Sequence, residues 1–205
     1  MAYIIAVAAP VGGGKTSLVK AIADKLGNAT TIHFDHYEKI TQEPVRNLLQ
    51  WIKNGADFDD FAIPGLSNDL DKLKRGESII EPMTNKEISS EKYIIFEMPL
   101  GKEHKDTAEY IDLLLWVEIP FDIALARKVR EFTNTFITEH EPEKLRESLI
   151  WLDQYLDNYL TVIREVLFIQ KKKVSVNADI IIDGQSNLET MVQHATKEIL
   201  NKISE

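Results

Sequence analysis

Short apolar runs alternate along the chain with longer segments whose apolar residues recur at helical spacing. Continuous apolar runs of about four to eight residues are typical of strands in a parallel sheet that helices cover on both faces. The pattern predicts such strands at 3–8, 30–34, 92–96, 113–119 and 178–183. We therefore expect an α/β fold, with a parallel five-stranded sheet and helices on both faces.

The segments between these runs predict helices. The first covers 15–26 and stops at Gly27, because glycine tolerates the left-handed turn that follows many helices. A second follows the fourth strand over 121–131, and the longest spans 141–170. The least regular segment is 54–90, where proline and glycine interrupt the pattern.

The composition fits one domain. The chain has 205 residues, 44% of them hydrophobic, and no linker or repeat divides it, so we expect a single domain over 1–205. A formal net charge of −9 makes nucleic acid and anionic membranes unexpected partners. The absence of cysteine excludes disulfides, thiolate catalysis and cysteine-ligated zinc. The opening run 3–9 is too short to span a bilayer and lacks a basic leader, so we expect a cytoplasmic protein.

A glycine-rich stretch directly behind the first strand carries the strongest chemical signal. Residues 9–16, APVGGGKT, match the phosphate-loop pattern G-x-x-x-x-G-K-[ST] except at the first position, where Ala9 replaces glycine. Glycine amides can wrap phosphates, Lys15 can neutralise the outer two, and Thr16 can coordinate Mg²⁺. The alternative is an ordinary strand-to-helix turn, which the surrounding βαβ pattern disfavours. The expected nucleotide-binding residues are Pro10, Val11, Gly12, Gly13, Gly14, Lys15, Thr16 and Ser17.

Two acidic residues follow other predicted strands, so they should meet Lys15 at the same edge of the sheet. Asp35 follows the second strand and could accept the proton of a substrate hydroxyl as it attacks a γ-phosphoryl group. Its alternative role is a local turn or helix cap. Glu97 follows the third strand, where an acid can complete the shell of Mg²⁺ or its water; the alternative is a solvated acid. The candidate metal-binding residues are therefore Thr16 and Glu97.

The stretches PVGGGKTSL, FDHYEK, YIIFE, IDLLLWVEIPFDIALARKVRE and ADIIIDG occur in an order that resembles the uridine kinase-like P-loop kinases, a group that includes phosphoribulokinases and pantothenate kinases. The resemblance implies a P-loop NTPase fold with a helical lid at approximately 121–141. It also implies transfer of a phosphoryl group from ATP to an alcohol with Mg²⁺ as cofactor. In this resemblance Asp35 matches the catalytic aspartate, Glu97 the strand-end acid, and Arg127 and Arg130 the lid arginines.

Arg127 and Arg130 also stand three positions apart on one helical face, where they could neutralise charge on a transferring phosphoryl group. The alternative for both is a solvated basic face.

The chain departs from the family where uridine kinases carry nucleoside-holding residues. Thr84 and Asn85 stand where a tyrosine and an aspartate are typical. We therefore expect uridine and cytidine to be poor acceptors. The preferred acceptor would be another small alcohol, including one whose charge meets Arg127, Arg130 or Lys102.

Two function classes stay open. One is an ATP- and Mg²⁺-dependent kinase of a small, nucleoside-like or other alcohol; the other is a P-loop regulatory protein that binds or hydrolyses nucleotide without such activity. Asp35 and the lid arginines favour the kinase, because a switch needs neither a hydroxyl base nor a lid. The missing nucleoside residues favour the regulatory protein. The aromatic set Trp151, Tyr155 and Tyr159 follows helical spacing, which predicts core packing or contact with a second copy in a homo-oligomer. The alternative is a wall of the substrate site.

Overall fold

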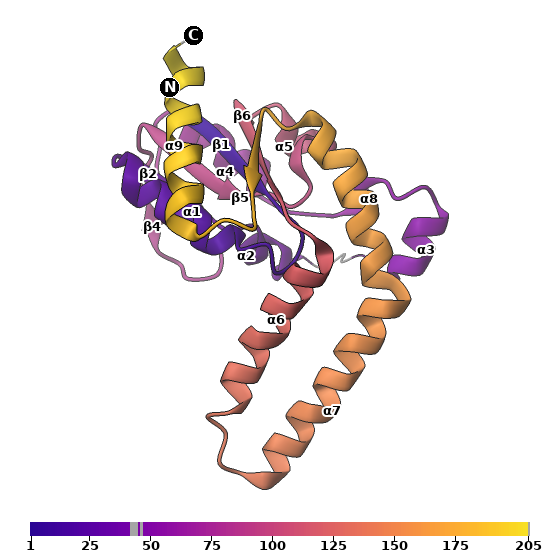
Figure 1. Cartoon of the computed structure of the whole chain (residues 1–205). Coiled ribbons are helices and arrows are strands. Elements are labelled where there is room, and N and C mark those ends of the chain that lie inside the picture. Colours follow the sequence, from indigo (N-terminus) through magenta and orange to yellow (C-terminus); the bar gives the residue numbers. More distant parts are fainter. Residues whose placement is uncertain (42–44, 46, 205) are drawn as a thin grey trace.

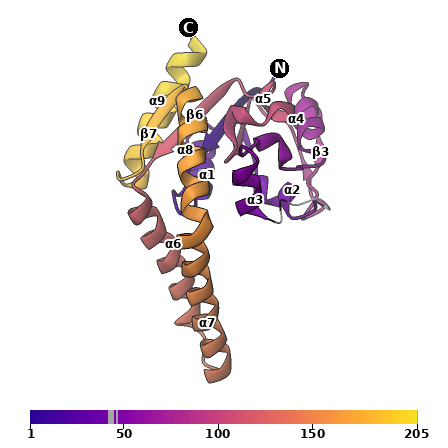
Figure 2. The same ribbon diagram turned by 90° about the vertical axis from the view of Figure 1, so that its right-hand side faces the viewer.

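The structure is a computed structural model that describes residues 1–41, 45 and 47–204. Figure 1 shows a layered body that contains the sheet, with both termini at one end, and a long helical hairpin that projects from the opposite side. In the view turned by 90°, the hairpin again extends far beyond the other elements (Figure 2). The hairpin is thus joined to the body at one end only.

The body is built around a parallel five-stranded sheet. Its strands are β1 (Tyr3–Ala8), β2 (Ala29–Ile32), β5 (Tyr93–Glu97), β6 (Leu113–Glu118) and β7 (Ile180–Asp183). Their order is β2-β5-β1-β6-β7, and every neighbouring pair is parallel. The predicted α/β class with a five-stranded parallel sheet is confirmed. A separate antiparallel hairpin is formed by β3 (Ile79–Ile80) and β4 (Glu87–Ile88).

Helices and short helical turns connect the strands of the described chain. The α-helices are α1 (Lys15–Leu26), α2 (Phe34–Glu38), α3 (Leu48–Lys53), α4 (Leu66–Lys74), α5 (Lys105–Ala108), α6 (Phe121–Phe136), α7 (Pro142–Asn158), α8 (Arg164–Val174) and α9 (Leu188–Ser204). The 3₁₀ turns are η1 (Phe58–Asp60), η2 (Gly101–Glu103) and η4 (Ser175–Asn177), and η3 (Tyr159–Ile163) is a π-helical segment. Helix α1 has the predicted bounds.

Helices cover both faces of the sheet, as predicted, because successive side chains of a strand point to opposite faces. In β1, Ile5 and Val7 face a core that includes the apolar sides of α1 and α9. Ile4 and Ala6 face a second core, to which α2, α4 and α8 contribute. Each core buries its apolar side chains almost completely.

The second strand is shorter than predicted. The sequence predicts a strand over 30–34, but β2 ends at Ile32 and the chain turns into α2, with His33 at its N-cap. β2 is an edge strand that pairs with β5 alone, and its last paired residue is Ile32, opposite Phe96. Since no ladder holds the chain beyond that pair, residues 34–38 are free to form a helix, and Asp35 lies on that helix.

The projecting hairpin consists of α6 and α7. α6 extends five residues beyond the predicted 121–131, and the predicted helix over 141–170 is observed as α7, η3 and α8 in succession. Aromatic rings join its two arms, since the ring of Phe132 lies 4.7 Å from that of Trp151 and 5.0 Å from that of Tyr155. Within the described residues, no helix is both long enough and apolar enough to cross a membrane.

Candidate active site

A cavity of about 660 Å³ lies at the carboxyl-terminal edge of the sheet. Its walls come from the loop between β1 and α1, from α2, from the end of β5, from the segment around η1, and from α6 and α8. Ligands of open parallel sheets bind at this edge, and their sites commonly measure about 300–1,000 Å³. The cavity is therefore the candidate active site.

The phosphate loop at this edge depends on glycine. Gly12 and Gly14 have φ angles of 77° and 84°, a region that side chains disfavour. A Cβ atom on Gly12 would lie 2.1 Å from the carbonyl oxygen of Ala124, because the loop packs directly against the start of α6. α1 then begins without a side-chain cap and without an acidic residue in its first turn. The positive end of its dipole is therefore not neutralised, which suits a bound anion.

The structure places the predicted loop residues in two layers. Pro10 and Gly13 are buried, and a Cβ atom on Gly13 would lie 2.8 Å from the Pro10 carbonyl oxygen. The others line the cavity: Val11, Gly12, Gly14, Lys15, Thr16 and Ser17. The residues that line the cavity can contact a polyphosphate, and the two buried residues hold the loop in its conformation.

Burial and nearby carboxylates act in opposite directions on the pKa of Lys15. Its ammonium Nζ donates hydrogen bonds to the carbonyl oxygens of Ala9, at 2.9 Å, and Pro10, at 3.2 Å. Burial lowers the pKa of Lys15, and the nearby carboxylates of Glu97 and Asp35 act against that change. A desolvated ammonium in reach of a phosphate interacts with it more strongly than one in water.

Glu97 and Thr16 meet where the predictions expect a metal ion. Glu97 is only 5% exposed, and its Oε1 lies 3.1 Å from Nδ1 of His33. Burial acts to raise the pKa of Glu97, but hydrogen bonding from His33 and Thr16 outweighs it and holds this pKa below its usual value. The described chain has no cluster of three or more histidine and acidic side chains suited to a metal. Because Mg²⁺ at nucleotide sites uses few protein ligands together with phosphates and water, a hydroxyl beside a carboxylate fits it.

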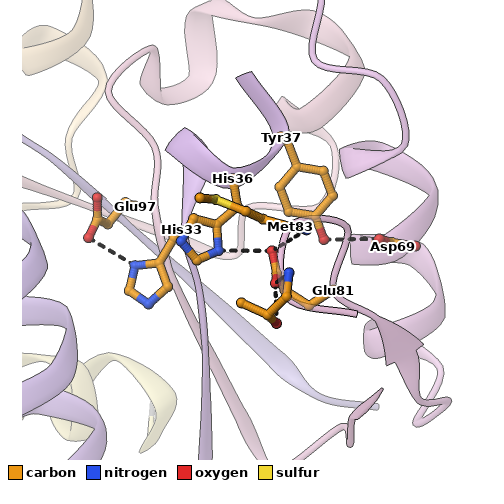
Figure 3. A network of polar contacts seen from close by, with 8 residues as sticks. His33, His36, Tyr37, Asp69, Glu81, Met83 and Glu97 are labelled. Carbon is orange, nitrogen blue, oxygen red and sulfur yellow. Dashed lines mark hydrogen bonds and ion pairs between the residues drawn. The ribbon is translucent and has the colours of Figure 1, made fainter. Parts of the chain in front are cut away.

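Side chains tie α2 to three neighbouring elements (Figure 3). The imidazole of His33, at the N-cap of α2, contacts the carboxylate of Glu97 at the end of β5. His36 Nδ1 lies 2.8 Å from Oε1 of Glu81, at the end of the β3–β4 hairpin. The hydroxyl of Tyr37 donates to Asp69 of α4 at 2.9 Å. These contacts fix the position of a five-residue helix that would be unstable alone.

Glu81 is itself a buried carboxylate, 5% exposed. It accepts hydrogen bonds from the backbone N–H groups of Thr84, at 2.6 Å, and Met83, at 3.2 Å, and from the Thr84 hydroxyl. Burial acts to raise the pKa of Glu81, but the hydrogen bonds from Thr84 and Met83 outweigh it and hold the pKa below its usual value. Neither Thr84 nor Asn85 lines the cavity, so the structure does not bring these two positions to the site.

Asp35 lines the cavity from α2, together with Glu38 one turn later. Burial raises the pKa of Glu38, and the adjacent Asp35 carboxylate adds to this rise. Sequence reasoning missed Glu38 because it ended the preceding strand at residue 34, which hid the helical i, i+3 spacing of the two acids.

The structure separates the two predicted lid arginines. Arg127 lines the cavity, and its Nη1 donates to the carbonyl oxygen of Gly184 at 2.9 Å. Arg130, one turn further along α6, does not line the cavity, although both arginines are exposed. Lys128 does line it, although sequence reasoning did not select this residue. The position of Lys128 next to Arg127 in ARKVR is the sequence feature that could have identified it.

Part of the cavity lining comes from apolar residues that were not among the predicted site residues. We call it the acceptor wall; it consists of Phe34, Phe58, Phe61, Leu100, Val166 and Leu167. Phe58 and Phe61 come from the segment 54–90, which the sequence shows only as irregular. No spacing rule connects them with α8, so this wall was not predictable from local pattern.

The fold and the cavity define the class: an α/β protein with the architecture of a P-loop kinase. No protein-family model matches the sequence. The chain is 26% identical to a uridine kinase of Halobacterium salinarum, over 96% of this chain and 89% of that protein. A gluconokinase structure from Sinorhizobium meliloti 1021 superposes with a TM-score of 0.54 at 16% identity, covering 99% of this chain and 98% of that one.

A structure described as a possible uridine kinase from Bacillus stearothermophilus superposes with a TM-score of 0.52 at 10% identity, covering 89% of each chain. These similarities confirm the predicted resemblance to uridine kinase-like P-loop kinases and the fold class. They also support the prediction that the chain is an enzyme, a small-molecule kinase.

Proposed function

We propose that the chain is a kinase that transfers the γ-phosphoryl group of ATP to a hydroxyl of a small alcohol, with Mg²⁺ as cofactor. One observation carries the proposal: Asp35 lines the same cavity as Lys15, Thr16 and Glu97. A carboxylate beside a phosphate loop is in reach of a hydroxyl that attacks the terminal phosphoryl group.

In the proposed reaction the loop amides and Lys15 bind the phosphates of ATP. Thr16 and Glu97 would hold Mg²⁺ directly or through its water, and the ion would supply positive charge beside the phosphates when bound. Arg127 adds positive charge from α6, whereas Lys128 also lines the cavity but is paired with Glu131 at 2.9 Å, and Arg130 does not line it. Asp35 accepts the proton of the attacking hydroxyl. Because a water-poor site strengthens each of these interactions, positioning and electrostatics supply most of the rate enhancement.

The acceptor wall supports a kinase over a nucleotide-binding regulatory protein. The cavity that contains Asp35 is also lined by aromatic and aliphatic side chains, and a nucleotide switch has no need of such a lining. We further propose that 1–205 acts as a single domain in the cytoplasm, with a lid at about 121–141.

Replacement of the base tests the function. Asp35→Asn should leave the affinity for MgATP unchanged and lower transfer to an accepted alcohol by about a hundredfold or more, the scale of general-base catalysis. Asp24→Asn, an exposed carboxylate on α1 outside the cavity lining, is the matched control and should change neither. Equal transfer by wild type and Asp35→Asn would remove Asp35 from the mechanism. Hydrolysis of ATP without transfer to any alcohol, equal in both proteins, would favour the regulatory function.

A further inference from the structure

His33 connects the acid proposed for the metal with the helix that carries the proposed base. Its Nδ1 lies 3.1 Å from Oε1 of Glu97, at the end of β5, and His33 is also the N-cap residue of α2. Asp35 follows two positions later, in the first turn of that helix. One side chain therefore joins the end of β5 to the start of α2 (Figure 3).

The hydrogen bond between His33 and Glu97 has a defined direction. The pKa of Glu97 lies below its usual value, so this carboxylate is ionised near neutral pH. An ionised carboxylate only accepts, so Nδ1 of His33 carries the hydrogen and donates it. Because Glu97 is almost fully buried, hydrogen bonds from fixed donors replace the water that it loses. The imidazole thus restricts the orientation of the Glu97 side chain.

Glu97 keeps acceptor capacity for a metal ion. The two oxygens of a carboxylate together offer about four lone-pair positions. His33 uses one of them at Oε1, and Thr16 supplies a further hydrogen bond. The remaining positions can bind Mg²⁺ or one of its waters, since Mg²⁺ at nucleotide sites keeps several waters. At metal sites in general, a partner that hydrogen-bonds a metal-binding side chain sets its orientation.

His33 is itself held from a second side. Its ring centroid lies 5.1 Å from that of His36, with the rings tilted by 47°. His36 in turn contacts the buried Glu81, which the backbone N–H groups of Met83 and Thr84 hold in place. Figure 3 shows the two imidazoles between the carboxylates of Glu97 and Glu81. Contacts on two sides keep the imidazole of His33 in one position, as a fixed donor requires.

We propose that His33 is a positioning residue of the kinase reaction: its Nδ1–H holds the Glu97 carboxylate in the orientation that binds Mg²⁺, and its N-cap position ties α2, with Asp35, to that acid. Placement of the metal and of the base then depends on the same imidazole. His33 is not among the residues that line the cavity, so it acts through Glu97 and α2. This inference rests on the proposed kinase function.

The contribution of Mg²⁺ to nucleotide binding tests the contact with Glu97 without turnover. Calorimetric titration with the non-hydrolysable ATP analogue AMP-PNP is carried out with Mg²⁺ and, separately, with EDTA. The ratio of the two dissociation constants is the Mg²⁺ enhancement, and in wild type the analogue should bind more tightly with Mg²⁺. His33→Ala should lower the enhancement to about the value of Glu97→Gln, a loss of about tenfold. Because the enhancement is a ratio within one protein, damage that affects both titrations equally cancels.

Two further variants separate positioning from general support of α2. His33→Asn places an amide N–H near the position of Nδ1, so it should keep most of the wild-type enhancement. His36→Ala removes the other imidazole and its contact with Glu81 but leaves the hydrogen bond to Glu97. It is the matched control and should keep the wild-type enhancement. A merely structural role would lower the enhancement equally in His33→Ala and His36→Ala.

Hydrogen exchange of the backbone amides of α2 tests the connection to the base. In wild type, adding Mg²⁺ to the AMP-PNP complex should slow this exchange, because the ion holds Glu97 and Glu97 holds His33 at the start of the helix. The response to Mg²⁺ should disappear in His33→Ala and persist in His36→Ala.

The outcomes separate the inference from the function on which it rests. The inference would be overturned, with the kinase function intact, by a wild-type enhancement in His33→Ala, by equal losses in His33→Ala and His36→Ala, or by no Mg²⁺ enhancement in wild type. An α2 exchange response that is the same in wild type and His33→Ala would overturn it as well. A wild type that does not bind AMP-PNP under either condition would overturn both.

Discussion

The phosphate end and the acceptor end of the cavity differ in how much of the chain is needed to build them. The phosphate end is centred on one stretch, Pro10 to Ser17, between a strand and the helix that follows it, and α6 adds Arg127 and Lys128. The acceptor end combines α2, the segment around η1, the turn after β5, and α8. Its residues span positions 34 to 170 of the sequence.

The two ends also differ in the interactions that hold them in place. At the phosphate end, the backbone itself forms the anion site, because the site depends on glycine φ angles and on the start of α1. At the acceptor end, side chains must be held by other side chains, as in the contacts of His36 with Glu81 and of Tyr37 with Asp69. The acceptor end is therefore expected to respond to substitutions far from the cavity, and the phosphate end to substitutions within its loop.

The largest expected effect comes from removing the cation of the phosphate end. Lys15→Ala should abolish phosphoryl transfer and weaken ATP binding by about 1.5–3 kcal/mol, the value of a charge-assisted contact. Calorimetric titration with ATP measures the binding. Lys20→Ala, on an exposed position of the same helix, should bind ATP as wild type does. Unchanged ATP affinity in Lys15→Ala would contradict the loop assignment.

The two arginines of α6 offer a sharper comparison within the phosphate end. Arg127→Ala should lower kcat/KM by about tenfold to a hundredfold, because Arg127 lines the cavity. Arg130→Ala should change it by no more than about threefold, because Arg130 does not line the cavity. Steady-state rates at varied MgATP measure both. Equal losses would mean that the hairpin brings Arg130 to the phosphates during turnover.

At the acceptor end, a smaller and more selective effect is expected from the aromatic wall. Phe61→Leu keeps an apolar side chain but removes the stacked ring, so the KM for an accepted alcohol should rise about threefold to tenfold. The KM for MgATP should not change, since Phe61 is not part of the phosphate loop. Parallel increases in both KM values would show that the two ends are not independent.

The smallest effect is expected on stability, from the buried acid that holds α2. Glu81→Gln should lower the free energy of unfolding by about 1–2 kcal/mol near neutral pH, because charged hydrogen bonds are weakened. The folded-state pKa of Glu81 lies below its ordinary value of 4.5, so this stabilisation is present above that value. It is lost as pH falls through the folded pKa.

Denaturant unfolding of both proteins at about pH 6.5 and about pH 3.5, on either side of the ordinary glutamate range, measures this difference. The deficit of Glu81→Gln should be largest at the higher pH and should shrink at the lower one. A deficit that grows on acidification would show that Glu81 is not the stabilising carboxylate inferred from its contacts.

The sequence by itself determined the sheet, the five strands to within two residues at each end, α1 and the phosphate loop. These features depend on neighbours in the chain: buried apolar runs specify strands, and GGGK between a strand and a helix specifies a turn with exposed amides. Asp35 and Glu97 were also predictable as neighbours of Lys15, because parallel strands end at one edge. The same reasoning ended β2 two residues too late, since only the pairing with β5 decides where that edge strand stops.

The tertiary structure alone decided which side chains form the acceptor end. Gln170 meets Ala9 across 161 positions, and His33 meets Glu97 across 64. Local periodicity carries no information about such distances, because they follow from how helices pack on the sheet. The same packing placed Arg127 in the cavity lining and left Arg130 outside it, although one helical face carries both. The sequence shows which residues share a face of a helix. Only the packing of that helix against the sheet decides which of them reach the cavity.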